Sequence, residues 1–313
     1  MIKTGIIGLG AIGQRLIKQF ESHPETEIAA VCDWDGTLAQ QVSESLGSIP
    51  FFSDYKEMLE TAELDLVYVA VPPKHHHGIA ASVMDRGIHI LCEKPLANSL
   101  EEAEDLFRRS QEKELVSAMN FPLNYSAGAR TFANLIRSEY IGKLRRIELH
   151  MRFPQWPRAW QQNNWVASRE QGGFVLEVGI HFIQQIHMLF GPLTVKNRVL
   201  EFPEDTLASE QGIVAELSLH DGTPVIIDGL SGIAGDEEIR LTAYGTEGTL
   251  SLLNWSDLEG GKLGESLAPI KQDSSLNEAL IDHIVRALKG EESIIIGFSE
   301  GYQAQTVLEQ LRN

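Results

Sequence analysis

The sequence has little cysteine, little positive charge and no long apolar run, and each shortage excludes a class of protein. Its two cysteines, Cys32 and Cys92, show no C-x-x-C or metal-ligand spacing, so we expect reduced thiols in a core. Lysine and arginine total 26 against 44 aspartates and glutamates, and the net charge of -18 repels nucleic acid and anionic lipid. No apolar stretch has the length that crosses a bilayer, so we expect neither nucleic acid nor a membrane as a partner.

What is present describes a globular chain. Its 313 residues, of which 43% are hydrophobic, are enough for two domains with separate cores. The apolar run at residues 2–17 is interrupted by glycines and carries Gln14 and Arg15, unlike a secretory leader. We therefore expect a cytoplasmic protein.

The first 119 residues alternate between apolar strands and helical patterns. The predicted strands are residues 3–8, 27–32, 49–52, 64–71, 87–92 and 115–119. Such alternation predicts right-handed crossovers and a parallel sheet with helices on both faces. We expect this domain to end near Asn120, which divides the chain into a first domain over residues 1–120 and a second domain over residues 121–313.

Three glycines stand between the first predicted strand and the first helix. Gly8, Gly10 and Gly13 form G-x-G-x-x-G, in which the first glycine makes the turn, the second admits a pyrophosphate and the third lets the helix pack closely. Asp33 ends the second strand, where its carboxylate can bind the adenine ribose and repel a 2′-phosphate, so we expect NAD rather than NADP. Trp34 is either a stacking partner for adenine or an ordinary surface residue.

Two further strands end in loops whose side chains could take part in binding or catalysis. Val71 is followed by PPKHHH, and three consecutive histidines cannot all reach one metal, so we expect no metal site and favour a loop beside the nicotinamide. The stretch Gly87–Ala97 contains Glu-Lys-Pro directly after its apolar run, which places Lys94 at the edge where open sheets bind ligands. Lys94 is either a solvated lysine or a proton relay.

The second half predicts a broad antiparallel sheet. Its strands fall at residues 144–152, 195–202, 212–219, 224–230, 238–244 and 249–253, with glycines marking several turns. Such a sheet with helices on one face leaves its other face open, and a second subunit usually covers an open face of this kind. We therefore expect a homodimer or homotetramer through this sheet.

Polar and aromatic side chains in this half suggest a substrate site. Glu177 and His181 share one face of a predicted helix over residues 174–190, as a satisfied buried pair or as a proton-transfer pair. Gly179 within that helix indicates the close approach of another backbone or a ligand. Asn124 and Tyr125 either bind hydroxyl groups or form a plain turn.

The loop at residues 154–165 holds three tryptophans. Trp156, Trp160 and Trp165 suit the C–H face of a sugar ring, and they suit the loop's own packing equally well.

Several stretches together resemble the Gfo/Idh/MocA oxidoreductases, the family that includes glucose-fructose oxidoreductase and inositol dehydrogenase. They are GIIGLGAIG, VAVPPKHHH, CEKPLA, GGFVLEVGIHF and AYGTEGTL. The resemblance implies an α/β chain with an N-terminal Rossmann domain, a C-terminal α/β domain with a large open, mainly antiparallel sheet, and hydride exchange between NAD and a carbohydrate or polyol. By position, it makes His76 the family histidine after the prolines, Lys94 the active-site lysine, and His181 the histidine beside the substrate hydroxyl.

The chain departs from the family pattern in two places. Glu177 stands where the family has an aspartate, and residues 122–125 replace an Asn-x-Arg type of stretch. Two alternatives to a dehydrogenase therefore stay open: a redox-neutral NAD-dependent lyase or glycosidase, and a non-catalytic sensor of NAD or sugar.

The expected site has three groups of residues. The expected catalytic residues are Lys94, His181 and Glu177. The expected substrate contacts are Asn124, Tyr125, Trp165 and His181. The expected cofactor contacts are Gly8, Gly10, Ala11, Ile12, Gly13, Asp33, Trp34, Val71, Pro72, His76, Glu93 and Lys94.

Overall fold

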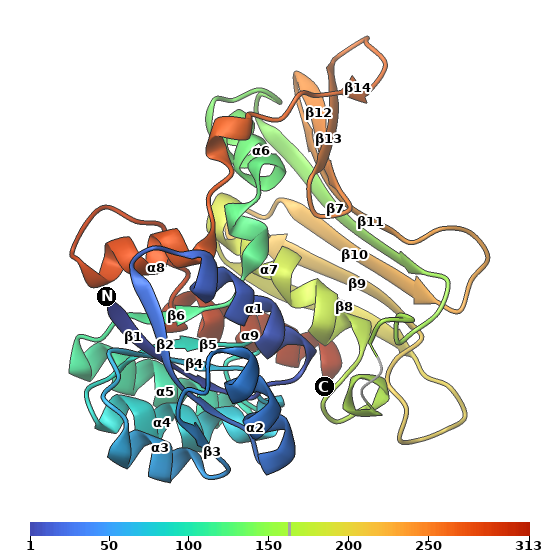
Figure 1. Ribbon diagram of the computed structural model, residues 1–313. Helices are drawn as coiled ribbons and strands as arrows, with labels where there is room; N and C mark the ends of the chain where they lie inside the picture. The colour runs from blue at the N-terminus through green and yellow to red at the C-terminus, as the bar shows by residue number, and fades with distance from the viewer. Residues whose placement is uncertain (162–163) are drawn as a thin grey trace. The chain divides into compact units, whose positions relative to one another are not determined.

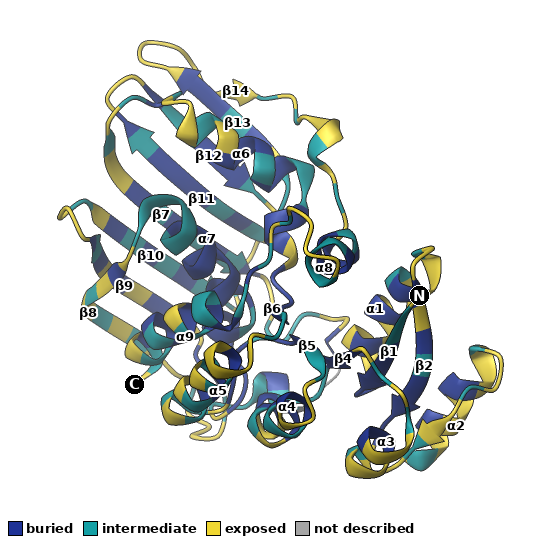
Figure 2. Ribbon diagram, turned by 90° about the vertical axis from the view of Figure 1, so that its left-hand side faces the viewer, coloured by how far each residue is buried: buried dark blue, intermediate teal, exposed yellow. Residues whose placement is uncertain are grey.

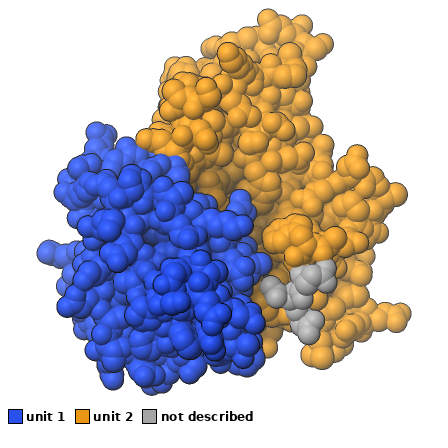
Figure 3. Space-filling model, viewed as in Figure 1, with its two compact units in different colours: residues 1–121, 279–302 blue, residues 122–278, 303–313 orange. Residues whose placement is uncertain are grey.

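The computed structural model describes residues 1–161 and 164–313, and the chain forms two compact units (Figures 1 and 3). Unit 1 contains residues 1–121 and 279–302, and unit 2 contains residues 122–278 and 303–313. The division differs from a single boundary near residue 120, because the chain returns to unit 1 for residues 279–302. There the N–H of Met119 donates a 2.7 Å hydrogen bond to the carbonyl of Ile296, and the Tyr302 ring stacks on Phe107 with centroids 5.6 Å apart.

Unit 1 is built on a six-stranded parallel sheet in the order β3-β2-β1-β4-β5-β6. Its strands are β1 (Ile2–Ile7), β2 (Thr26–Cys32), β3 (Phe51–Phe52), β4 (Leu66–Val69), β5 (His89–Cys92) and β6 (Ser117–Met119). All four residues of β4 are fully buried, which explains the continuous apolar runs of the sequence. The strand order reverses between β1 and β4, and ligands of such sheets bind outside the carboxyl ends of the strands at this reversal.

Helices connect the strands of unit 1. They are α1 (Ala11–Ser22), α2 (Gly36–Ser45), α3 (Tyr55–Thr61), α4 (His76–Asp85) and α5 (Leu100–Lys113), joined later in the chain by α8 (Leu280–Leu288) and the first residues of α9 (Phe298–Arg312). Figure 1 shows α3, α4 and α5 on one side of the sheet and α1 on the other. Cys32 and Cys92 are buried free thiols of this core, and burial raises the pKa of Cys32 to about 12.

Unit 2 is built on an eight-stranded sheet in the order β14-β13-β12-β11-β7-β10-β9-β8, in which only β7 and β10 pair in parallel. The strands are β7 (Leu144–Phe153), β8 (Leu193–Glu201), β9 (Gly212–Leu219), β10 (Pro224–Ser231), β11 (Glu238–Gly245), β12 (Gly248–Leu253), β13 (Asp257–Lys262) and β14 (Ala268–Pro269). Helices α6 (Ala127–Arg137) and α7 (Ile180–Phe190) lie on one face (Figures 1 and 2). The predicted fold class is therefore confirmed.

Residues of β7 alternate between the two faces of this sheet. Ile147, Leu149 and Met151 are fully buried, whereas Glu148 and His150 between them are partly exposed. His150 lies 3.2 Å from Glu148 and 3.3 Å from Asp228, and Asp228 also pairs with Arg152, so this second face carries ionisable side chains. That it joins two subunits stays a prediction.

Short helical turns complete the chain. They are η1 (Pro73–His75), η2 (Pro122–Tyr125), η3 (Asn164–Ala167), the π-helical η4 (Val175–Gly179) and η5 (Ser274–Leu276). Across residues 1–161 and 164–313, the helices all fall short of the length and apolar character needed to cross a membrane.

Candidate functional site

The three glycines of the loop between β1 and α1 have different surroundings. Gly8 has a φ of +95°, and a Cβ on it would lie 2.4 Å from the carbonyl oxygen of Ala70. A Cβ on Gly13 would lie 2.1 Å from the carbonyl oxygen of Gly8. Gly10 differs, because, apart from Gly10 itself and its two chain neighbours, no atom of the described chain lies within 4 Å of the place where its Cβ would be. The protein's own packing therefore requires Gly8 and Gly13, while Gly10 leaves open space at the start of α1, where backbone N–H groups favour an anion.

Asp33 lies against this loop. Its Oδ2 accepts a 2.8 Å hydrogen bond from the N–H of Leu9, and its Oδ1 accepts a 3.0 Å bond from the N–H of Asp35. The side chain is buried, whereas the neighbouring Trp34 is 90% exposed. The Asp33 carboxyl group is thus fixed beside the glycine loop, and its contact with an adenine ribose stays a prediction.

His76 ties two strand-end loops together. Its side chain is fully buried, with Nδ1 2.8 Å from the carbonyl oxygen of Pro95 and Nε2 2.8 Å from that of Val71. Burial lowers the pKa of His76 to about 4, although the two carbonyl acceptors act in the opposite direction. Because a neutral imidazole carries one N–H, it donates to only one of the two carbonyls. The ring thus contacts protein on both sides, and its predicted contact with a cofactor stays a prediction.

The other two histidines of the PPKHHH stretch have different surroundings. His75 is exposed, and Nε2 of His77 lies 2.9 Å from the Asp105 carboxylate. In the part of the chain that the structure describes, no three or more histidine, cysteine, aspartate or glutamate side chains gather as a metal site would require.

Glu93 connects three neighbouring strands. Its Oε1 accepts hydrogen bonds from the Tyr68 hydroxyl at 2.6 Å and from the Asn120 amide at 2.5 Å. Burial raises the pKa of the Glu93 carboxyl. The side chain holds the ends of β4, β5 and β6 together, and the half-exposed Lys94 follows directly at that edge.

The remaining expected cofactor contacts lie near the same edge. Ala11 and Ile12 begin α1 and are exposed, and Val71 and Pro72 follow β4 and are half-buried.

In unit 2, Glu177 and His181 lie on one continuous helical segment. Glu177 belongs to the π-helical turn η4, and His181 belongs to the first turn of α7, where it is 6% exposed. π-helical turns inside helices occur frequently at functional sites. A Cβ on Gly179 would meet side-chain atoms of Met151 and Val175 at an ordinary 3.7 Å, so the predicted close approach of another backbone is wrong, and that of a ligand stays a prediction.

The segment is anchored by a residue that the sequence does not reveal. Oε1 of Glu210 accepts a 2.8 Å hydrogen bond from the N–H of Val175, the first residue of η4. Gly173 makes room for this carboxylate, because a Cβ there would lie 2.2 Å from Oε2 of Glu210. Burial raises the pKa of Glu210. The bond spans 35 residues of sequence, and no local pattern announces it.

The predicted substrate contacts differ in their surroundings. Asn124 and Tyr125 are buried in η2, and the Asn124 amide donates a 2.8 Å hydrogen bond to Oε1 of Gln184 on α7. Trp165 is half-buried in η3. These contacts with a substrate stay predictions.

The tryptophan loop is partly a packing element. Trp156 packs against Phe153 and Phe174, with ring centroids 5.1 Å and 6.0 Å away, whereas Trp160 is 60% exposed. Residues 162 and 163 of this loop lie outside the described residues.

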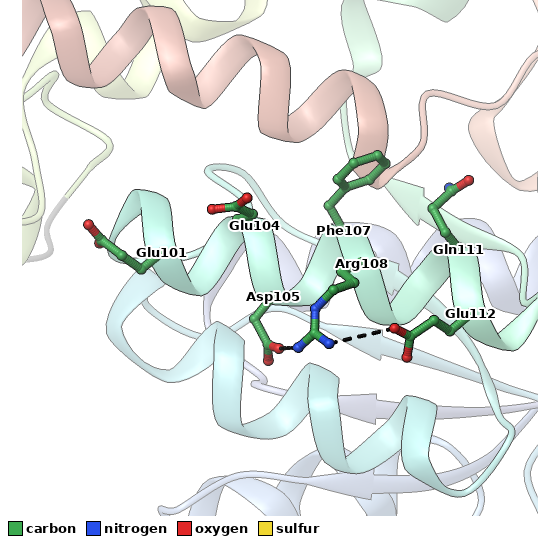
Figure 4. A pocket seen from close by; sticks show the side chains of 7 residues that line it. All are labelled: Glu101, Glu104, Asp105, Phe107, Arg108, Gln111 and Glu112. Atoms are coloured by element: carbon green, nitrogen blue, oxygen red, sulfur yellow. Dashed lines mark hydrogen bonds and ion pairs between the residues drawn. The ribbon is translucent and has the colours of Figure 1, made fainter.

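A surface hollow runs along α5 (Figure 4). Arg108 forms ion pairs with Asp105, at 2.7 Å, and with Glu112, at 3.6 Å, along the helix. All of the side chains that line the hollow come from α5, and we assign the hollow no part in the site. The lining residues are Glu101, Glu104, Asp105, Phe107, Arg108, Gln111 and Glu112.

Comparison with known proteins covers nearly the whole chain. Residues 2–121 match the family model described as oxidoreductase family, NAD-binding Rossmann fold. Residues 133–313 match the companion model described as oxidoreductase family, C-terminal alpha/beta domain.

Similar sequences and structures agree with these matches. The dTDP-3,4-didehydro-2,6-dideoxy-alpha-D-glucose 3-reductase of Actinomadura kijaniata is 27% identical over 69% of this chain and 68% of its own length. The crystal structure of the 3-ketoreductase KijD10 from Actinomadura kijaniata with NADP and TDP-benzene has a TM-score of 0.84 at 21% identity, covering 99% of this chain and 97% of its own. The WlbA dehydrogenase of Bordetella pertussis with NADH and UDP-GlcNAcA also scores 0.84, at 20% identity over 99% and 95%.

Proposed function

The chain belongs to the Gfo/Idh/MocA family of NAD(P)-binding oxidoreductases, and from that premise we propose that it transfers a hydride between NAD and a CH–OH or C=O group of a sugar, an inositol or a related polyol. The observation that carries the proposal is the open space at Gly10, since the protein's own packing does not require a glycine there, and a pyrophosphate close to the backbone would.

The glycine loop and Asp33 fit a dinucleotide. The loop and the start of α1 would hold the pyrophosphate, and Asp33 would accept hydrogen bonds from the adenine ribose. The fixed carboxylate of Asp33 disfavours a 2′-phosphate, so we propose NAD over NADP, although the similar structures contain NADP in one case and NADH in the other. When bound, the nicotinamide supplies or accepts the hydride.

Three side chains of this protein would handle the proton. His181 would take the proton of the substrate hydroxyl during oxidation and return it during reduction. Lys94 would stabilise the developing alkoxide or relay its proton, and Glu177 would orient the imidazole of His181. A carbohydrate substrate is supported by the relatives, one of which is a reductase of a dTDP-linked keto sugar.

The test begins with binding and turnover. Purified protein is titrated with NADH and NADPH. Absorbance at about 340 nm is then followed after sugars, inositols and their keto forms are added as substrates. We expect tighter binding of NADH and turnover of at least one compound. Product formation without net NADH would indicate the redox-neutral alternative, and tight NADH binding with no reaction would indicate the sensor.

A lysine variant tests the proton step. Lys94→Ala should lower kcat about a hundredfold or more, while NADH affinity changes little. Lys56→Ala, which removes an exposed lysine of α3, serves as the control and should leave both unchanged. Equal turnover in Lys94→Ala and wild type would remove Lys94 from the mechanism.

We also propose that unit 2 carries the substrate contacts and joins subunits through the second face of its sheet. Solution scattering at micromolar concentration should give the mass of a dimer or tetramer. A monomeric mass would contradict the subunit contact without touching the proposed chemistry.

A further inference from the structure

The turn between β12 and β13 carries a tryptophan where glycine is favoured. Its two central residues, Asn254 and Trp255, have φ values of +46° and +77°, and the N–H of Ser256 donates a 3.0 Å bond to the carbonyl of Leu253. Positive φ at both central residues is the pattern of a type I′ turn, for which Asn-Gly is the preferred pair. Asn254 fits this preference, and Trp255 does not.

The backbone of this turn is held from several sides. Asn254 and Ile239 exchange two hydrogen bonds, of 2.8 Å and 3.0 Å, and the Ser126 hydroxyl donates a 3.3 Å bond to the Trp255 carbonyl. Helix α6 packs directly on the turn, because a Cβ on Gly128 would lie 1.7 Å from the carbonyl oxygen of Ser256. Strained conformations persist where the surroundings over-determine them, and they cluster at functional sites. The direction of the Trp255 side chain is thus set by its surroundings.

That direction leads to the first turn of α7. The Trp255 ring lies 5.2 Å from the His181 ring at an interplanar angle of 73°, with the edge of one ring against the face of the other. It also lies 5.2 Å from the Phe182 ring at 50°. Such edge-to-face contacts are favourable, and they limit rotation of the His181 imidazole about the Cβ–Cγ bond.

We propose that Trp255 is a positioning residue that fixes the imidazole plane of His181. The proposal rests on the proposed function, in which His181 exchanges a proton with the substrate hydroxyl. A proton-transfer group must meet its partner within hydrogen-bond reach, and a misplacement of about 1 Å can lower the rate about a hundredfold. In this proposal, the contact of its ring with His181 accounts for a tryptophan at a turn position that favours glycine.

The first test removes the ring and keeps the turn. Glycine suits a φ of +77°, so Trp255→Gly should fold with its backbone intact. We expect kcat to fall about tenfold or more with KM for NADH within about twofold, and Trp255→Phe to restore kcat to within about threefold of wild type. The control is Glu139→Gly, which also places glycine at a positive φ, of 59°, but at an exposed residue, and it should leave kcat unchanged.

The second test needs no activity. The ring protons of His181 are assigned in the NMR spectrum by their loss in His181→Gln, and they should shift in Trp255→Gly because the indole ring current is gone. Glu139→Gly should leave them in place. If Trp255→Gly does not fold, Trp255→Leu keeps apolar bulk beside Phe182, and the same loss of kcat and the same shift are expected.

The outcomes separate the two proposals. If His181→Gln is inactive while Trp255→Gly turns over like wild type, the positioning role is overturned and the proposed function stands. If His181→Gln keeps wild-type turnover, the proton role of His181 is overturned, and the inference falls with it. Unchanged His181 resonances in the folded variant would likewise overturn the inference.

Discussion

The N–H of Leu9 donates a 2.8 Å hydrogen bond to Oδ2 of Asp33, which fastens the glycine loop to the end of β2. Asp33 is therefore a hydrogen-bond acceptor that shapes the loop, and in the proposed function its charge also meets the cofactor. Two substitutions separate these actions, because asparagine keeps an acceptor oxygen and loses the charge.

We expect Asp33→Asn to keep one of the two backbone hydrogen bonds, to be modestly less stable than wild type, and to lower the preference for NADH over NADPH about tenfold, because the repulsion of the 2′-phosphate is removed. Asp33→Ala should in addition lose about 1–3 kcal/mol of stability, since buried N–H groups are left without their acceptor. Fluorescence titrations and thermal melts measure both effects. An unchanged NADH to NADPH ratio in Asp33→Asn would show that its charge does not select the cofactor.

The three glycines of the loop should respond differently to alanine. A Cβ at position 10 meets open space, so Gly10→Ala should melt at the wild-type temperature yet bind NADH at least about tenfold more weakly. A Cβ at position 13 would collide with the Gly8 carbonyl, so Gly13→Ala should lower Tm by several degrees even without ligand. Melting curves and NADH titrations of the two variants provide the comparison. Normal NADH affinity in Gly10→Ala would contradict the assigned pyrophosphate site.

His76 should make the protein sensitive to acid. Because burial lowers the pKa of His76 to about 4, the unfolded chain binds more protons than the folded chain between that pH and its unfolded pKa of roughly 6.5. Stability should therefore rise with pH across this window, by about 3 kcal/mol from this residue, and be lost as the pH falls.

Urea unfolding at several pH values tests this dependence. His76→Gln should flatten the slope between about pH 4 and 6.5, because glutamine does not titrate there. His220→Gln, at an exposed position, should keep the wild-type slope. A wild-type slope in His76→Gln would assign the acid sensitivity to other groups.

Glu210 should matter for both stability and turnover. Glu210→Ala leaves the N–H of Val175 without its acceptor at the start of η4, so we expect a loss of about 1–3 kcal/mol. Because the same helical segment carries Glu177 and His181, kcat should also fall. Glu204→Ala, at an exposed residue, is the control. Wild-type Tm and kcat in Glu210→Ala would show that the helix start holds without this contact.

Local patterns in the sequence predicted most of the fold, because the spacing of apolar residues along the chain follows the buried faces of strands and helices. Strand β9 covers the predicted residues 212–219, and β2 begins at Thr26, one residue before the predicted strand at 27–32. Strand β13 was not predicted, since its sequence DLEGGK has two glycines and little of the β-branched composition of a strand.

The supports of the site could not be predicted, because they join residues that are distant in sequence. Nothing near His76 indicates that its ring reaches the Pro95 carbonyl, 19 residues later. Likewise, nothing near Trp255 indicates His181 as its neighbour, and a tryptophan in a turn is recognised as unusual only when its φ is known. The glycine motif and Asp33 could be predicted, since the spacing between strand end and helix start is itself the signal.

Because residues 279–302 return to unit 1, that unit is built from two separate segments of the chain. Its β6 segment pairs with the later segment through the bond from Met119 to Ile296 and the bridge between Ala118 and Gly297. A protease that cuts once near residue 121 therefore leaves residues 1–121 held to residues 279–302 by noncovalent contacts alone. Residues 1–121 expressed alone should recover their native form only when a peptide carrying residues 279–302 is added, as in fragment complementation.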